Sequence, residues 1–141
     1  MNVAQVAERA VTINLIGHVG KVTGIEFLPN TTQFISSSED GTLRLFDFEQ
    51  QSQLIYVGES MLDECCALNS EWFVAAGESL FLFSRMKRSP VQKIDVNENS
   101  KQENLSFAQK LIQTVSCVFG YGIVATAIFG EVVIYQFDGE S

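Results

Sequence analysis

Short runs that alternate between apolar and polar residues recur along the chain, and most of them are followed by a turn signal. A period of two over the stretch 17–57 predicts four strands. They are expected at 22–27, 33–38, 42–48 and 52–57. Asp40-Gly41 separates the middle two runs, and Asp-Gly between two strand patterns is typical of a tight hairpin. The stretch 17–57 is therefore predicted to form one antiparallel sheet.

The same order of runs returns twice with weaker turn signals. In the stretch 58–96, strands are expected at 62–68, 72–76, 80–84 and 91–96. In the stretch 111–137, they are expected at 114–119, 123–127 and 132–137, with no fourth run after them. A spare apolar run at 11–16 precedes Gly17 and could supply the missing outer strand. The total is then twelve strands, or three sheets of four.

The polar stretch 97–110 interrupts this rhythm. It is rich in Asn, Gln and Ser, which favours a solvated loop between the second and third sheets. The alternative is an excursion that binds a partner. In that case a short amphipathic helix is expected, with an apolar side formed by Leu105, Phe107, Leu111 and Ile112.

The order Gly17-His18, two strands, Asp40-Gly41 and a strand ending Phe46-Asp47 resembles the WD repeat, one blade of a β-propeller. The resemblance implies an all-β fold over residues 1–141, with blades at 17–57, 58–96 and 111–137. Three blades are fewer than the roughly four to eight of a closed ring. The chain is therefore expected to be part of a larger propeller, to pair with itself into six blades, or to begin with the outer strand of a preceding blade.

The WD resemblance also implies a structural role for the single histidine. In WD repeats the Gly-His histidine joins a buried network with a strand serine, the turn aspartate and a strand tryptophan. The matching positions here are His18, Ser36, Asp40 and Phe46. Because the phenylalanine side chain has no N–H to donate, the network is expected to be one hydrogen bond short. The second and third blades have no such set, since Ala75, Ala125 and Phe129 occupy the corresponding serine and aspartate positions.

The charge balance bears on the choice of partner. The chain has 17 acidic and 9 basic residues and a net charge of −8, which argues against wrapping nucleic acid by bulk electrostatics. Arg85, Lys87 and Arg88 form the one local basic cluster, on a turn after a predicted strand. Two interpretations stay open for this cluster. It is either a solvated turn or a contact site for RNA or an acidic protein.

The three cysteines are expected to be reduced thiols in an intracellular protein. Cys65 and Cys66 are adjacent on a predicted strand, so their side chains point to opposite faces. A vicinal disulfide and a metal site are the alternatives, and the absence of a Cys-x-x-Cys pair counts against both. No metal or other cofactor is therefore expected.

Catalytic and membrane signals are weak throughout. Asp63-Glu64 and Glu39-Asp40 are neighbours that point to opposite faces of a strand, and Gly120-Tyr121-Gly122 lacks the third glycine of a dinucleotide fingerprint. No apolar run reaches the roughly 18 residues of a membrane span, and the first nine residues show no secretory leader pattern. We expect no enzymatic activity, no small-molecule substrate and no membrane partner. A propeller-based hydrolase is the least favoured class.

The connectors between the blades resemble those of a more specific family, the WD-repeat proteins of the U3 small nucleolar ribonucleoprotein. The similar segments are SQLIY at 52–56, WFV at 72–74, LFLFS at 80–84, MKRSPV at 86–91 and IVAT at 123–126. The resemblance implies the C-terminal part of a seven-bladed ring. It also implies a nucleolar scaffold with ribonucleoprotein partners that supports U3 snoRNA binding and pre-rRNA processing for the small ribosomal subunit. The alternative is a generic WD adaptor, nuclear or cytoplasmic, that binds protein or peptide partners in another complex.

Overall fold

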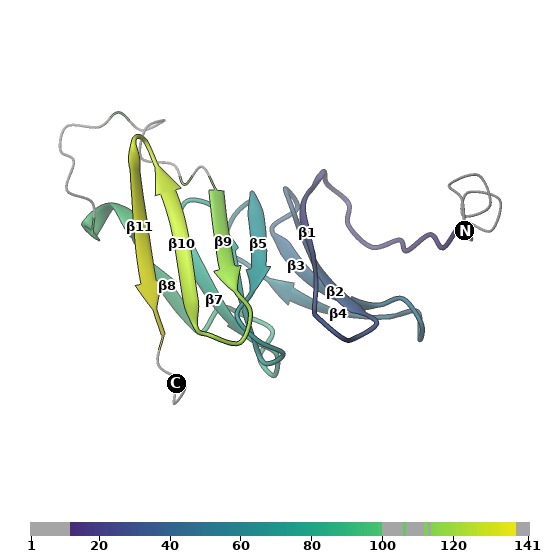
Figure 1. Ribbon diagram of the computed structural model, residues 1–141. Coiled ribbons are helices and arrows are strands. Elements are labelled where there is room, and N and C mark those ends of the chain that lie inside the picture. The colour runs from purple at the N-terminus through teal and green to yellow at the C-terminus, as the bar shows by residue number, and fades with distance from the viewer. Residues whose placement is uncertain (1–11, 100–105, 107–111, 113, 138–141) are drawn as a thin grey trace, which may run out of the picture.

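The computed structural model describes residues 12–99, 106, 112 and 114–137, and these form three antiparallel sheets (Figure 1). Blade 1 contains β1 (Val22–Phe27), β2 (Gln33–Ser38), β3 (Thr42–Asp47) and β4 (Ser52–Val57). Blade 2 contains β5 (Glu64–Ala67), β6 (Trp72–Ala76), β7 (Leu80–Ser84) and β8 (Gln92–Ile94). Blade 3 contains β9 (Thr114–Val118), β10 (Ile123–Ile128) and β11 (Glu131–Gln136). The predicted all-β class is confirmed.

Each blade is a meander in which consecutive strands pair in chain order. Turn chemistry accounts for the tightest connections. Gly41 has a φ of 84° and Gly130 a φ of 69°, which is left-handed backbone that glycine adopts without a side-chain clash. The Gly41 N–H donates to Ser38 O at 3.1 Å and closes the turn between β2 and β3. The glycines at these two positions therefore determine where the β2–β3 and β10–β11 hairpins turn.

The apolar core lies between the blades. Blades 1 and 2 meet around Ile35, Leu45, Tyr56, Phe73 and Phe83, all at most 3% exposed. Blades 2 and 3 meet around Val74, Leu82, Val115, Val124 and Ile128. Blade 2 is therefore covered on both faces, whereas blades 1 and 3 each pack through one face. Burial of these interblade side chains is the main force that holds the sheets together.

Polar side chains also make hydrogen bonds between neighbouring blades. Glu26 Oε2 on β1 accepts a hydrogen bond from the Ala67 N–H on β5 at 2.9 Å. Glu64 Oε2 on β5 accepts one from Thr114 Oγ1 on β9 at 2.8 Å. Tyr56 donates its hydroxyl hydrogen to Arg85 O at 2.7 Å. These contacts complement the apolar packing and set the register of neighbouring blades.

A disulfide bond joins Cys66 on β5 to Cys117 on β9, with the two Cα atoms 5.8 Å apart. The expectation of three reduced thiols is therefore wrong. Cys65 and Cys66 do point to opposite faces, because Cys65 packs in the core between blades 1 and 2 and Cys66 in the core between blades 2 and 3. Cys117 comes from 51 residues away, and only the packing of β9 beside β5 brings it to Cys66.

The free thiol of Cys65 lies next to this disulfide in sequence but is chemically quiet. It is buried, and burial raises its pKa to about 12. The thiol is therefore protonated at neutral pH and is a poor nucleophile toward the neighbouring disulfide.

The segments outside the blades differ from expectation in one respect. The expected strand 11–16 is not formed over residues 12–16, and Val11 lies outside the described residues. This segment lies along blade 1, where Gln53 Nε2 donates to Ile16 O at 3.1 Å. Its pairing with blade 3 stays a prediction for a closed ring.

The expected loop 97–110 begins in the 3-10 turn η1 (Val96–Asn99). Residues 100–105 and 107–110 lie outside the described residues, as does most of the alternative helix with Leu105, Phe107 and Leu111. Ile112 is described and is buried in the core between blades 2 and 3. In the described part of the chain, no helix has the length and apolar character to cross a bilayer.

Candidate functional site

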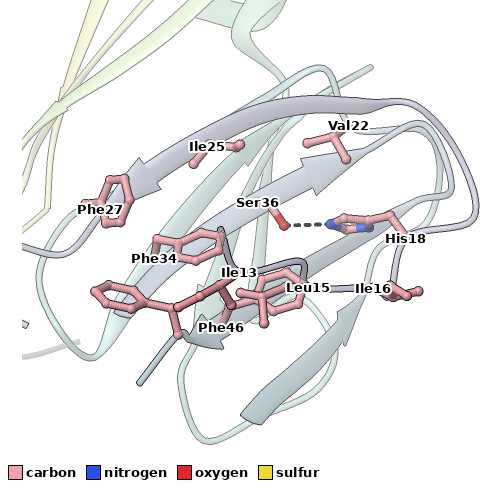
Figure 2. A pocket seen from close by; sticks show the side chains of 12 residues that line it. Ile13, Leu15, Ile16, His18, Val22, Ile25, Phe27, Phe34, Ser36 and Phe46 are labelled. Atoms are coloured by element: carbon pink, nitrogen blue, oxygen red, sulfur yellow. Dashed lines mark hydrogen bonds between the residues drawn. The ribbon is translucent and has the colours of Figure 1, made fainter. Parts of the chain in front are cut away.

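Three of the predicted network residues meet at the edge of blade 1. Figure 2 shows the contact between two of them, His18 and Ser36. His18 comes from the loop before β1, Ser36 from β2 and Asp40 from the turn between β2 and β3. His18 Nε2 lies 2.6 Å from Ser36 Oγ, and His18 Nδ1 lies 3.1 Å from Asp40 Oδ2. A proton on Nδ1 is donated to the carboxylate, which leaves Nε2 to accept the serine hydroxyl hydrogen. The imidazole thereby bridges a strand and a turn.

The Asp40 carboxylate collects several donors. Oδ1 accepts from the Thr42 N–H at 2.8 Å and from Thr42 Oγ1 at 2.6 Å, and Oδ2 also accepts from the Val19 N–H at 3.0 Å. Burial acts to raise the pKa of Asp40, but the hydrogen bonds from Thr42, Val19 and His18 outweigh it and hold that pKa well below its usual range. Asp40 is therefore ionised at neutral pH and ties the loop before β1 to the turn.

Phe46 takes part by packing alone. Its ring meets the His18 ring edge-on at 6.3 Å and stacks on Phe34 at 5.2 Å. Thr42, which the sequence analysis did not single out, supplies polar contacts instead: its Oγ1 lies 3.0 Å from His18 Nδ1 and accepts from Arg44 Nε at 3.2 Å. The signal for Thr42 was its place two residues after the turn aspartate, where its N–H and hydroxyl both reach the carboxylate.

A serine in contact with a histidine that in turn contacts an aspartate is also the arrangement of a hydrolytic triad. Whether a substrate could reach these three residues therefore matters. A nucleophilic serine needs a reachable hydroxyl and donors aimed at the developing oxyanion. Ser36 is only 2% exposed, and the side chains of His18 and Asp40 are each 5% exposed. The contacts of all three side chains satisfy one another inside the blade. We therefore interpret the network as a structural clip.

A hollow of about 630 Å³ lies beside this network, between segment 12–16 and the outer face of blade 1 (Figure 2). Its walls are mostly apolar, with both aliphatic and aromatic side chains. They comprise Ile13, Leu15, Ile16, Gly17, His18, Val22, Ile25, Phe27, Phe34, Ser36, Phe46 and Phe48. Ile25 and Phe27 remain 60% exposed, so this face is open to another apolar surface.

The basic cluster lies on the turn after β7, and the fold already uses two of its members. Arg85 Nη1 donates to Gln33 Oε1 and to Ser70 O, each at 3.2 Å. The Arg88 guanidinium lies 5.2 Å from the centre of the Tyr56 ring, a cation–π contact. Lys87 is exposed on the same turn. Lys87 is thus the member of the cluster most available to an external anion.

Within the described residues, no group of three or more His, Cys, Asp and Glu side chains gathers as a metal site would require. Two acidic groups nevertheless have raised pKa values. Burial raises the pKa of Asp63, with a contribution from Glu39. Burial also raises the pKa of Glu26; the Ala67 N–H opposes that rise, and the charge of Glu64 adds to it. Glu26 lies at the contact between blades 1 and 2, where its carboxylate accepts the hydrogen bond from the Ala67 N–H.

Changing Glu26 to Gln is expected to stabilise the fold at neutral pH. The folded pKa of Glu26 lies above its unfolded value, so the ionised form destabilises the protein, and this cost fades as pH falls through that pKa. Glutamine removes the charge and keeps an oxygen for the Ala67 N–H. Urea unfolding should show E26Q more stable than the parent at pH 7 and similar to it near pH 4.

The matched control is Glu26→Ala, which leaves the buried Ala67 N–H without its acceptor. It should lose about 1–3 kcal/mol, the usual cost of an unsatisfied buried donor. An E26Q protein less stable than the parent at pH 7 would contradict this account of Glu26.

Comparison with known proteins bears on the type of repeat in the first part of the chain. Residues 10–47 match the family model "WD domain, G-beta repeat". Human WD repeat-containing protein 97 is 43% identical over 56 residues, which is 40% of this chain and 3% of that protein. The predicted WD repeat is thus supported over residues 10–47, which include β1 to β3.

Two solved structures extend the comparison to the whole fold. "Structure of U3-55K" matches 85% of this chain and 51% of its own chain, with a TM-score of 0.58 and 20% identity. "Crystal structure of RRP9 WD40 repeats" matches 85% and 50%, with a TM-score of 0.59 and 20% identity. The chain spans about half the length of these two propellers. The predicted partial β-propeller is confirmed as a fold.

Proposed function

We propose that this partial WD-repeat propeller is a non-enzymatic scaffold that holds macromolecular partners in a complex. The observation that carries the proposal is the use of the His18, Ser36 and Asp40 side chains. They hydrogen-bond one another inside blade 1 and are almost fully buried. These potentially catalytic side chains therefore stabilise the blade. The surfaces left for partners are the sheet faces and the connecting turns.

We further propose that the complex is the U3 small nucleolar ribonucleoprotein. The chain would there support U3 snoRNA binding and pre-rRNA processing in the nucleolus. The similarity of the connectors at 52–56 and 86–91 supports this assignment. The fold shared with the protein of the structure titled "Structure of U3-55K" also supports it. Lys87, with Arg85 and Arg88 beside it, is the proposed RNA contact because it lies on an exposed turn.

Lys87→Glu is expected to weaken binding of a U3 snoRNA fragment several-fold without changing stability. Lys87 is exposed, so the change removes one phosphate contact rather than a fold contact. The slope of log K against log salt should fall by about one. Filter binding or fluorescence anisotropy across a salt series measures both quantities. The triple reversal of Arg85, Lys87 and Arg88 should abolish binding, with some loss of stability because Arg85 and Arg88 contact their own fold.

Lys21→Glu is the matched control, since Lys21 is also exposed but precedes β1, away from this turn. It should bind RNA like the parent. Equal binding by all of these variants, or no binding by the parent, would contradict the RNA contact.

The second candidate is an adaptor for protein or peptide partners in another complex. The net charge of −8 and the internal contacts of Arg85 and Arg88 favour it over a broad RNA surface. Purification of the tagged chain from cells, followed by sequencing of bound RNA and identification of bound proteins, separates the two. Enrichment of U3 snoRNA supports the ribonucleoprotein. Protein partners without U3 snoRNA support the adaptor.

A further inference from the structure

The connection between β7 and β8 is a continuous run of exposed residues. β7 ends at Ser84, and β8 begins at Gln92. Every residue from 86 to 93 is exposed except Pro90, which is half-buried, and Met86 is 84% exposed. An enzyme that modifies a folded protein needs such a run, because it must surround the acceptor side chain and its neighbours. This turn therefore meets the first requirement of a modification site.

Ser89 carries the one hydroxyl group of this run. It is exposed, and no hydrogen bond to its hydroxyl is found within the described part of the chain. Ser84 at the end of β7, by contrast, is half-buried, and its Oγ accepts from the Met86 N–H at 3.2 Å. Ser36 is buried against His18. A group can therefore be added to Ser89 without breaking a side-chain contact of the fold.

The residue after Ser89 narrows the class of modifying enzyme. The chain has two prolines, Pro29 and Pro90, and only Pro90 follows a serine or threonine. Proline has no N–H and biases the preceding residue toward extended backbone. A protein kinase that accepts proline at this place binds its substrate extended and needs no hydrogen bond from the N–H after the acceptor. Ser89-Pro90 is thus the single Ser/Thr-Pro pair that the chain offers to a proline-directed kinase.

Two backbone hydrogen bonds bracket Ser89 and hold the run against the fold. The Val57 N–H donates to Arg88 O at 2.7 Å. The Val91 N–H donates to Leu82 O at 2.8 Å. Opening so short a surface segment costs far less free energy than unfolding a blade. A kinase can therefore draw Ser89 into its active site while blade 2 stays folded.

Three cationic side chains precede the Ser89 hydroxyl. Arg88 is its direct neighbour, and Lys87 and Arg85 lie two and four residues before it. Lys87 is exposed, and the Arg88 guanidinium is held at the surface over the Tyr56 ring. A phosphate ester carries a charge of about −1.5 to −2 at pH 7 and three acceptor oxygens, for which guanidinium and ammonium groups are strong donors. A phosphate on Ser89 would therefore find its donors beside it.

We propose that Ser89 is the acceptor of a proline-directed serine/threonine kinase, and that its phosphate pairs with Arg88 and Lys87 and closes this turn to other anions. In the transfer, Ser89 Oγ attacks the γ-phosphorus of ATP and forms an ester bond. The bond from that phosphorus to the β–γ bridging oxygen breaks, ADP leaves, and the hydroxyl proton passes to the catalytic aspartate of the kinase. Closure to other anions rests on the proposed RNA contact at Lys87, whereas the acceptor and the pairing do not.

Treatment of the native chain with ATP, Mg²⁺ and a purified cyclin-dependent kinase, which is proline-directed, tests the acceptor. Mass spectrometry should find one phosphate per chain, on the peptide that contains Ser89. Ser89→Ala should take up none, and Pro90→Ala should react about ten-fold more slowly, as expected when one recognition contact is lost. Ser84→Ala is the matched control and should react like the parent. Equal uptake by Ser89→Ala, or uptake by the parent only after unfolding in urea, would overturn the assignment.

Phosphorus NMR of the phosphorylated chain tests the pairing. The second pKa of phosphoserine is ordinarily about 6, and adjacent cations lower it because they favour the dianion. The pKa of the Ser89 phosphate should therefore lie below about 6 and rise toward it in Lys87→Ala and in Arg88→Ala. Lys21→Ala, which removes an exposed cation before β1, should leave it unchanged. A phosphate whose pKa is the same in all of these proteins would exclude the pairing.

Binding of a U3 snoRNA fragment tests the closure of the turn. The phosphorylated parent should bind about ten-fold more weakly than the unmodified parent, because the phosphate occupies the cations and repels the RNA backbone. Ser89→Ala treated with the same kinase should bind like the unmodified parent. Equal binding by the two forms of the parent would overturn the closure. A parent that binds no RNA would overturn the proposed RNA contact and the closure with it, while the acceptor and the pairing are decided by mass spectrometry and phosphorus NMR.

Discussion

Changing both Cys66 and Cys117 to Ala is expected to lower the free energy of unfolding by about 4 kcal/mol relative to the oxidised parent. The reason is that the disulfide closes a loop of 51 residues in the unfolded chain. The bond joins β5 to β9 and so links blade 3 covalently to blade 2. Urea unfolding without reductant measures the difference. The parent should lose the same amount when dithiothreitol is added, whereas the double variant should not respond.

Cys65→Ala provides the control, since Cys65 is equally buried on the same strand but is a free thiol. That variant should keep its response to dithiothreitol. Thiol titration of the denatured, unreduced parent should find one free thiol of the three cysteines. A parent whose unfolding midpoint does not move with reductant, or which titrates as three thiols, would argue against the disulfide.

The Asp40→Ala protein is expected to lose about 1–3 kcal/mol, the usual cost of leaving buried polar partners unsatisfied. The carboxylate accepts from the Thr42 N–H, the Thr42 hydroxyl and His18, and the alanine side chain accepts from none of them. The loss for His18→Ala should lie in the same range, because Ser36 Oγ and the Asp40 carboxylate each lose a hydrogen-bond partner. Changing both residues should cost less than the sum, since they share one network.

Stability measured at acid pH distinguishes the effect of the Asp40 charge from that of its hydrogen-bonding geometry. Its folded pKa lies below its unfolded value, so the stability it contributes is present above about pH 4 and is lost as pH falls further. Asp40→Asn keeps an oxygen acceptor but has no charge to lose. Its stability should therefore fall less steeply than that of the parent below pH 4.

Glu39→Ala tests whether any change in the turn between β2 and β3 lowers stability as Asp40→Ala is expected to do. Glu39 is the exposed neighbour in the same turn, so its change should stay within about 0.5 kcal/mol of the parent. If Asp40→Ala proves as stable as Glu39→Ala, the network is not a determinant of the fold.

The strands and hairpins could be predicted from the sequence because their causes are local. A period of two decides which residues share a face, and Asp40-Gly41 suits the left-handed backbone of a tight turn whatever lies around it. The meeting of His18, Ser36 and Asp40 follows the WD resemblance, and the geometry places them together. The role of Thr42 was missed because it depends on a side-chain rotamer at the turn.

Contacts between blades could not be predicted in this way, since they depend on which faces the curvature of the array brings together. Cys117 reaches Cys66 only because β9 packs beside β5, and Arg88 meets Tyr56 only because the turn after β7 folds back on blade 1. Alternation in the sequence determined which residues of each strand share a face. Tertiary structure decided that blade 2 buries both of its faces while blades 1 and 3 leave one each in water, because an open array of sheets has two ends and only a further sheet can cover them.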